Sequence, residues 1–230
     1  MALTNIILTG GINHDYEDTS NALAEVLLEA DIKSTVYLDI DEGFEALAQT
    51  SFDLVTLSAL RWRMLDDDKY IPFRAEWQYE ISEQNRNNLI QHVIQGRGLL
   101  GLHTAAICFD TWQQWPQLLG AKWVWGQTFH PPPEHFTVKP VSDHEALSGL
   151  EDFPVIDEIY HNIEPQPGAA PLLSATSSED GSTQTLAWAQ HFESGRVIYH
   201  ALGHDRASVT SPGHKQFLRQ AALWCIGDQA

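Results

Sequence analysis

Cysteine is scarce in this sequence, which holds only Cys108 and Cys225 among its 230 residues. Two cysteines so far apart give neither the disulfide framework of a small secreted protein nor the closely spaced pairs of a structural zinc site. We therefore expect two buried or unreactive thiols in a reducing compartment, and we place the protein in the cytoplasm.

Basic residues and long apolar stretches are also few. The chain has 13 lysines and arginines against 31 acidic residues, and its formal net charge of −18 would repel a nucleic acid or an anionic membrane surface. The apolar run Ile6-Ile7-Leu8 ends at Gly10-Gly11, which makes it too short for a signal peptide or a membrane span. These absences argue against nucleic-acid and membrane partners, and they leave the formation of a homo-oligomer open.

Alternating strand and helix patterns fill the first half of the chain. Apolar residues at helical spacing predict helices after the capping candidates Asp18 and Thr19 and after Ser82. Short apolar runs predict strands at residues 5–9, 35–38, 53–57 and 99–102. This alternation is typical of an α/β fold with a mainly parallel sheet, and 43% hydrophobic residues suffice for the core of a single domain over residues 1–230.

The pattern changes in two other regions. Residues 60–80 lack a clear period and predict an insertion or a lid. The second half is richer in strand-like runs, at residues 135–141, 185–190 and 196–200, and it closes with a helix over residues 213–226.

Two histidines follow predicted strands. His14 comes after the first strand, and His103 stands where the strand at 99–102 turns into the next helix. Ligands of open parallel sheets bind beside the carboxyl ends of the strands. We therefore expect His14, His103 and the loop after the third strand to converge.

Five segments of the chain carry a family resemblance: residues 10–15 (GGINHD), 98–105 (GLLGLHTA), 126–131 (GQTFHP), 157–160 (DEIY) and 195–204 (GRVIYHALGH). In this order and spacing the chain resembles the ThuA-like (trehalose utilisation) family over nearly its whole length. The resemblance implies the three-layer, flavodoxin-like fold of the class I glutamine amidotransferases. It also implies a small-molecule sugar substrate and a role in the catabolism of trehalose or of 3-keto-glycosides. Glu145 departs from the pattern, since the family usually has proline there.

Glutaminase activity is not expected, although the resemblance implies a fold like that of the amidotransferases. Such an enzyme needs a cysteine thiolate on the sharp turn between strand and helix, where the helix N-terminus lowers the pKa of the thiol. That turn carries His103 here, and Cys108 lies more than one helical turn further along.

The polar residues that match the family are the candidate site. Neutral imidazoles and one carboxylate are suitable ligands for zinc, manganese, iron or nickel, and we expect no nucleotide cofactor. The same residues could instead act as acids, bases or hydrogen-bonding groups without a metal. We assign catalytic roles to His103, Glu158 and His204, and the candidate metal ligands are His14, His103, His130, Glu158 and His204.

Neighbouring residues are candidates for binding the sugar. Asp15 follows His14, and Tyr160 shares a strand face with Glu158, whereas Asp157 should face away from Glu158. One tryptophan of four in irregular regions should stack on the sugar ring, and we choose Trp125 over Trp62, Trp77 and Trp123. Five further histidines have no converging motif and are interpreted as surface or capping residues: His135, His144, His161, His191 and His214.

Three hypotheses remain open at this point. The first is an enzyme that acts on a sugar or a keto-glycoside by metal-assisted or His/Glu acid–base chemistry. The second is a non-catalytic carbohydrate-binding or regulatory protein on an amidotransferase-like scaffold. The third is a metal-dependent amidase or esterase. A shared fold does not separate them, because one scaffold hosts many functions.

Overall fold

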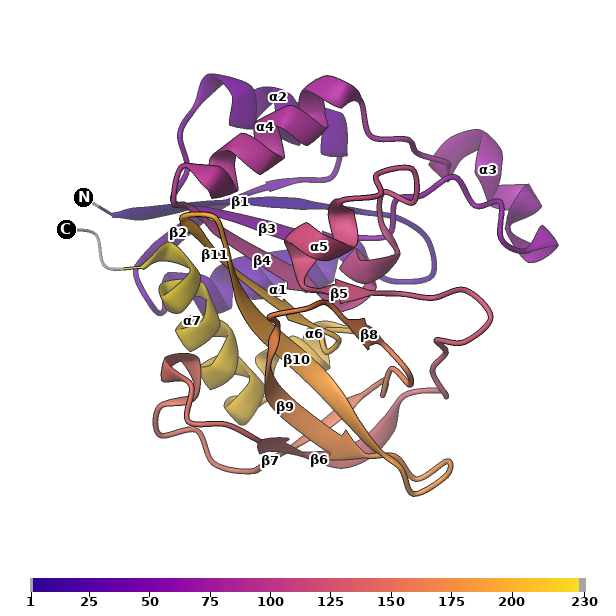
Figure 1. The fold of residues 1–230 in the computed structure, drawn as a ribbon, viewed down its shortest axis with the longest axis vertical. Helices are drawn as coiled ribbons and strands as arrows, with labels where there is room; N and C mark the ends of the chain where they lie inside the picture. The colour runs from indigo at the N-terminus through magenta and orange to yellow at the C-terminus, as the bar shows by residue number, and fades with distance from the viewer. Residues whose placement is uncertain (1, 228–230) are drawn as a thin grey trace.

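A nine-stranded mixed sheet runs through the computed structural model, which describes residues 2–227 (Figure 1). Five neighbouring strands are parallel, in the order β2 (Ile32–Tyr37), β1 (Leu3–Gly10), β3 (Leu54–Ala59), β4 (Gly98–Leu102) and β11 (Gly195–His200). Four antiparallel strands extend this sheet, in the order β10 (Thr183–Phe192), β9 (Ala170–Thr176), β6 (Glu134–Pro140) and β7 (Phe153–Asp157). Strands β5 (Ala121–Lys122) and β8 (Glu164–Pro165) form a separate small sheet.

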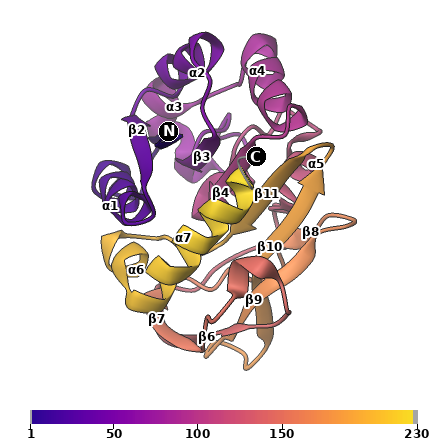
Figure 2. The ribbon, with the colours of Figure 1, turned by 90° about the vertical axis from the view of Figure 1, so that its left-hand side faces the viewer.

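Helices cover both faces of the parallel part, so the predicted α/β architecture is confirmed (Figure 2). One face carries α1 (Tyr16–Leu28), α6 (Arg206–Thr210) and α7 (Pro212–Ile226), and the other carries α2 (Ile40–Gln49) and α4 (Glu83–Ile94). The shorter helices are α3 (Ile71–Trp77), α5 (Trp115–Leu119), η1 (Asp68–Tyr70), η2 (His103–Ile107) and η3 (Glu145–Leu147). The parallel strand order has the flavodoxin-like pattern 2-1-3-4-5 when these five strands are counted along the chain.

Strand β1 shows why continuous apolar runs predicted strands here. Successive side chains point to opposite faces, so Ile7 packs against α1 while Ile6 and Leu8 pack against α2. All three are fully buried. A parallel strand covered by helices on both faces therefore needs no alternation of polar residues.

The structure confirms one predicted helix cap and contradicts another. Ser82 caps α4 by accepting a hydrogen bond from the amide of Asn85, as predicted. The prediction that Asp18 and Thr19 cap the first helix was wrong, because α1 begins at Tyr16 and its cap is Asp15. The Asp15 carboxylate accepts the amide of Asp18 at 3.1 Å.

The segment at residues 60–80 contains local structure that its sequence did not reveal. It forms η1 and α3, and α3 projects from the edge of the molecule in Figure 1. Trp62 and Met64 are nevertheless fully buried and anchor the segment. Among residues 2–227, no helix combines the length and the apolar character that a bilayer crossing requires.

Candidate functional site

His103 stands at the sharp turn that follows β4. Its backbone is left-handed, with φ of 49°, which is uncommon for a residue other than glycine. Its Nδ1 lies 2.6 Å from the carbonyl oxygen of Ala201 and therefore donates to it. The Nε2 atom of neutral His103 consequently keeps its lone pair, which points into the site.

His14 is held in the matching tautomer by a chain of hydrogen bonds. The hydroxyl of Thr104 donates to the carbonyl of Ala59 at 2.7 Å, so its oxygen accepts the hydroxyl of Tyr16 at 2.9 Å. The Tyr16 oxygen and the Ile12 carbonyl are then acceptors, 3.4 Å and 3.3 Å from His14 Nδ1. His14 Nδ1 therefore carries the proton, and its Nε2 has a free lone pair.

These two Nε2 atoms face each other at 3.1 Å. Two lone pairs at this distance repel each other unless a proton or a metal cation lies between them. The Nδ1 atoms of both histidines hydrogen-bond to backbone carbonyls or to a hydroxyl, and hydrogen bonds of this kind orient metal-binding histidines.

Glu158 comes from a distant part of the chain, one residue after β7, and only 5% of it is exposed. Its Oε2 lies 3.4 Å from His103 Nε2, and its Oε1 lies 3.3 Å from Nδ1 of His204, which follows β11. Glu158 Oε2 and His204 Nδ1 are both buried without a hydrogen-bond partner. Such atoms have unused ligand capacity.

Four of the five candidate metal ligands form one group whose ligand atoms all lie within 4.8 Å of one another: His14, His103, Glu158 and His204. Ligands bound to one ion at about 2.1 Å lie roughly 3.0–3.4 Å apart at octahedral and tetrahedral angles. The measured contacts of 3.1, 3.3 and 3.4 Å fall in this range. Three imidazoles and one carboxylate are also a ligand set that divalent transition metals accept. The group therefore fits such a metal.

His130 lies beside this group but has a different contact. Its Nδ1 lies 3.2 Å from Glu158 Oε2, and it donates to the carbonyl of Pro131 at 3.1 Å. An imidazole nitrogen that donates cannot bind a metal at the same atom. Nδ1 of His130 therefore lies beside the carboxylate of Glu158 without being a ligand.

Protonation states in the group suit a cation. Burial, helped by the nearby His103, lowers the pKa of His14 to about 4, so His14 is neutral at physiological pH. Burial would raise the pKa of Glu158, but the three surrounding histidines, His103, His130 and His204, outweigh it and hold this pKa well below its ordinary value. Neutral imidazole and ionised carboxylate are the forms that bind metals.

The candidate substrate-binding residues surround the group at different distances. The Tyr160 hydroxyl lies 3.2 Å from His103 Nε2, and the ring of Trp123 packs edge-on against Tyr160. Asp15 and His14 line a cavity of about 580 Å³, although the carboxylate of Asp15 also caps α1. Trp125 lines a second cavity of about 340 Å³, which Trp123 shares.

Some polar residues are buried where the sequence suggested surface positions. His161 and His214 were predicted to be surface or capping residues, which was wrong, since they are 1% and 0% exposed. His144 is a capping residue as predicted, because its Nδ1 accepts the amide of Ala146 at 3.2 Å. Sequence reasoning also missed Tyr16, whose only signal was its position two residues after His14.

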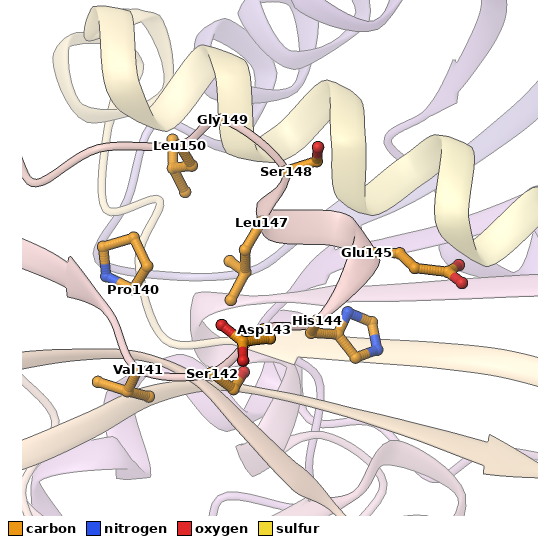
Figure 3. Close-up of a pocket in the computed structure, with 10 residues that line it drawn as sticks. All are labelled: Pro140, Val141, Ser142, Asp143, His144, Glu145, Leu147, Ser148, Gly149 and Leu150. Atoms are coloured by element: carbon orange, nitrogen blue, oxygen red, sulfur yellow. The ribbon is translucent and has the colours of Figure 1, made fainter.

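His144 also lines another pocket, which Figure 3 shows between the segment at residues 140–150 and the neighbouring elements. The pocket contains no member of the histidine and glutamate group. The histidine and glutamate group lies elsewhere, since its three histidines follow the parallel strands β1, β4 and β11 and Glu158 follows the antiparallel strand β7.

Comparisons with known proteins agree with this architecture. No curated protein sequence matches the chain. A ThuA-like protein from Parabacteroides merdae superposes with a TM-score of 0.78 at 15% identity, covering 98% of this chain and 90% of that one. A cytoplasmic protein from Salmonella typhimurium reaches a TM-score of 0.65 at 13% identity, covering 98% and 99%. A cold-adapted β-galactosidase from Rahnella sp. R3 reaches 0.60 at 16% identity, and 31% of its chain is covered against 96% of this one.

These structural likenesses, at such low identity, show the fold. The sequence itself goes further, because residues 6–225 match the family model ThuA, which is described as trehalose utilisation. That match spans nearly all of the chain and includes each residue of the histidine and glutamate group. The chain therefore belongs to the ThuA family.

Proposed function

We propose that the protein is an enzyme of carbohydrate metabolism that binds one divalent metal and acts on a sugar. The observation that carries this proposal is the pair of Nε2 lone pairs of His14 and His103, which face each other at 3.1 Å beside a buried carboxylate. The proposed ligands are His14, His103, Glu158 and His204. Zinc, manganese, iron and nickel are the metals that this donor set suits. A bound metal would polarise a carbonyl or hydroxyl oxygen of the sugar.

Two residues outside the ligand group are placed for proton transfer. Burial alone would lower the pKa of His130, but the Glu158 carboxylate 3.2 Å away outweighs it and raises this pKa above its ordinary value. We propose that His130 exchanges a proton with the substrate and that the Tyr160 hydroxyl donates to a sugar oxygen.

A keto-disaccharide is the substrate class that we propose. In a 3-keto-glycoside, a base removes the proton next to the ketone, the electron pair forms a carbon–carbon double bond, and the glycosidic oxygen leaves with a proton. The family description as trehalose utilisation supports a sugar. The two cavities lined by Asp15 and by Trp125 offer polar and aromatic surfaces for sugar rings. We also propose a cytoplasmic location, as the similar Salmonella protein is described.

The test is to incubate the purified protein with 3-keto-disaccharides and to follow the products by NMR. We expect turnover that stops after chelation and returns when the metal is restored. His103→Ala should be inactive in the same assay. Sugar binding without turnover under every metal would instead indicate a carbohydrate-binding protein, and the proposal of an enzyme would be wrong.

A further inference from the structure

We propose that Asp157 is a positioning residue whose buried carboxylate joins the two backbone segments that carry Glu158 and His204. This inference rests on the proposed metal-binding function, because it says what holds two of the four ligands in place. It concerns a side chain that does not itself enter the ligand group.

The hydrogen bonds of Asp157 carry the inference. Its Oδ1 accepts the backbone amide of Glu158 at 2.7 Å, and its Oδ2 accepts the backbone amide of Gly203 at 2.7 Å. Gly203 directly precedes His204 in the sequence and lies 46 positions after Asp157. One carboxylate therefore fixes the backbone at both ligands, which lie in the segments after β7 and after β11.

Ser208 and His214 extend this contact into the core. The hydroxyl of Ser208 donates to Asp157 Oδ2, and His214 Nδ1 lies 3.0 Å from the Ser208 carbonyl and 3.1 Å from the Ser208 oxygen Oγ. Asp157, Ser208 and His214 are all 0% exposed. Buried side chains that hydrogen-bond one another in this way restrict one another's positions.

The charge of the buried Asp157 carboxylate gives a second reason to assign it a positioning role. Among residues 2–227, no lysine or arginine forms an ion pair with Asp157. A buried carboxylate without a cationic partner is unfavourable unless several donors compensate it. The donors from Glu158, Gly203 and Ser208 supply this compensation, and a divalent cation in the neighbouring group would add to it.

Asp157→Asn is the sharpest perturbation, because it keeps the shape and removes one acceptor. The new amide group presents N–H donors where the carboxylate accepted donors, so at least one of the backbone amides loses its partner. Asp205→Asn is the matched control. Asp205 caps α6 through the amide of Ser208 at 2.8 Å, and asparagine caps helices about as well as aspartate.

Two measurements test the inference. The first is Zn²⁺ affinity from chelator competition, which should fall about 10-fold to 100-fold in Asp157→Asn and stay unchanged in Asp205→Asn. The second is amide hydrogen exchange by NMR without metal. The amide of Gly203, of Glu158 or of both should exchange at least about 10-fold faster in Asp157→Asn than in the wild type, as expected for a lost hydrogen bond to a charged group. If Asp157 only stabilised the fold as a whole, its substitution would not accelerate exchange at these two amides in particular while thermal unfolding remained cooperative.

Ser208→Ala keeps the inference testable if Asp157→Asn does not fold. It removes one donor to Asp157 and should weaken Zn²⁺ binding about 5-fold to 10-fold. Wild-type Zn²⁺ affinity together with wild-type exchange of the Gly203 and Glu158 amides in the folded variants would overturn the positioning role. A wild-type protein that binds no metal would overturn the proposed function instead, and amide exchange would still decide whether Asp157 positions the two segments.

Discussion

Glu158→Gln should remove metal binding while it preserves the shape of the site. The substitution replaces one carboxylate oxygen by an NH₂ group and removes the negative charge. Glu158 Oε2 lies 3.4 Å from His103 Nε2, and Oε1 lies 3.3 Å from His204 Nδ1. The variant therefore loses the only carboxylate of the four-residue group.

The magnitude follows from the charge that the variant loses. One unit of negative and one of positive charge attract each other by about 4 kcal/mol at about 4 Å and an effective dielectric constant of about 20, and a divalent cation at ligand distance is attracted more strongly. Part of this is offset by the hydration that the metal and the carboxylate give up on binding. We expect at least about 2.7 kcal/mol to remain, which is a 100-fold loss of affinity.

Chelator competition with Zn²⁺ measures this loss directly. Glu151→Gln is the control, because Glu151 is exposed and lies only seven positions before Glu158. Thermal unfolding of both variants without metal checks that the fold is intact. Wild-type affinity in a folded Glu158→Gln protein would refute the assignment of Glu158 as a ligand.

Three further predictions concern the rest of the chain. His103→Ala should lower sugar turnover at least about 100-fold with an unchanged near-UV circular dichroism spectrum, and an active variant would contradict its role. Burial lowers the pKa of His92 to about 4, so from pH 6.5 down to 4 the unfolded chain binds a proton that the folded chain does not. His92 alone should therefore lower the free energy of unfolding by about 3 kcal/mol over this window. His92→Leu should lose this contribution to the pH dependence, whereas exposed His135→Leu should match the wild type. Glutamine should not be hydrolysed, and mass spectrometry should find no acyl adduct on Cys108, since burial raises the pKa of its thiol to about 12.

The parallel half of the fold could be predicted because its strands other than the edge strand β2 are buried on both faces and are continuous apolar runs. The four antiparallel pairings could not be predicted in the same way, since their order depends on contacts between distant segments. Strands β6 and β7, for example, pair with each other, yet only β6 had a clear strand signal in the sequence.

The part of the site that could be predicted from the sequence consists of residues that come shortly after strands. His14, His103 and His204 follow three parallel strands, and such ends meet at one edge of a sheet. The role of Tyr16 in the tautomer of His14 depends on Thr104, which is 88 positions away from Tyr16 in the sequence. Side-chain contacts over such separations leave no periodic signal.

The burial of His214 could not be predicted for a similar reason. A histidine on a helix can face water or the core, and here it hydrogen-bonds Ser208 inside the core. The expectation that Asp157 and Glu158 point to different sides was sound, since only Glu158 enters the ligand group. The sequence did not reveal that the Asp157 carboxylate is buried next to the site, because this depends on the fold.

The measurement that tests the central claim most directly is the elemental analysis of freshly purified protein, compared with a variant that carries both His14→Ala and His103→Ala. Our account predicts a stoichiometric divalent transition metal in the wild type and its loss from the folded variant, because the facing Nε2 atoms supply half of the ligand group. A wild-type protein that remains metal-free after exposure to zinc, manganese, iron and nickel, or a double variant that retains the full metal content, would contradict the account.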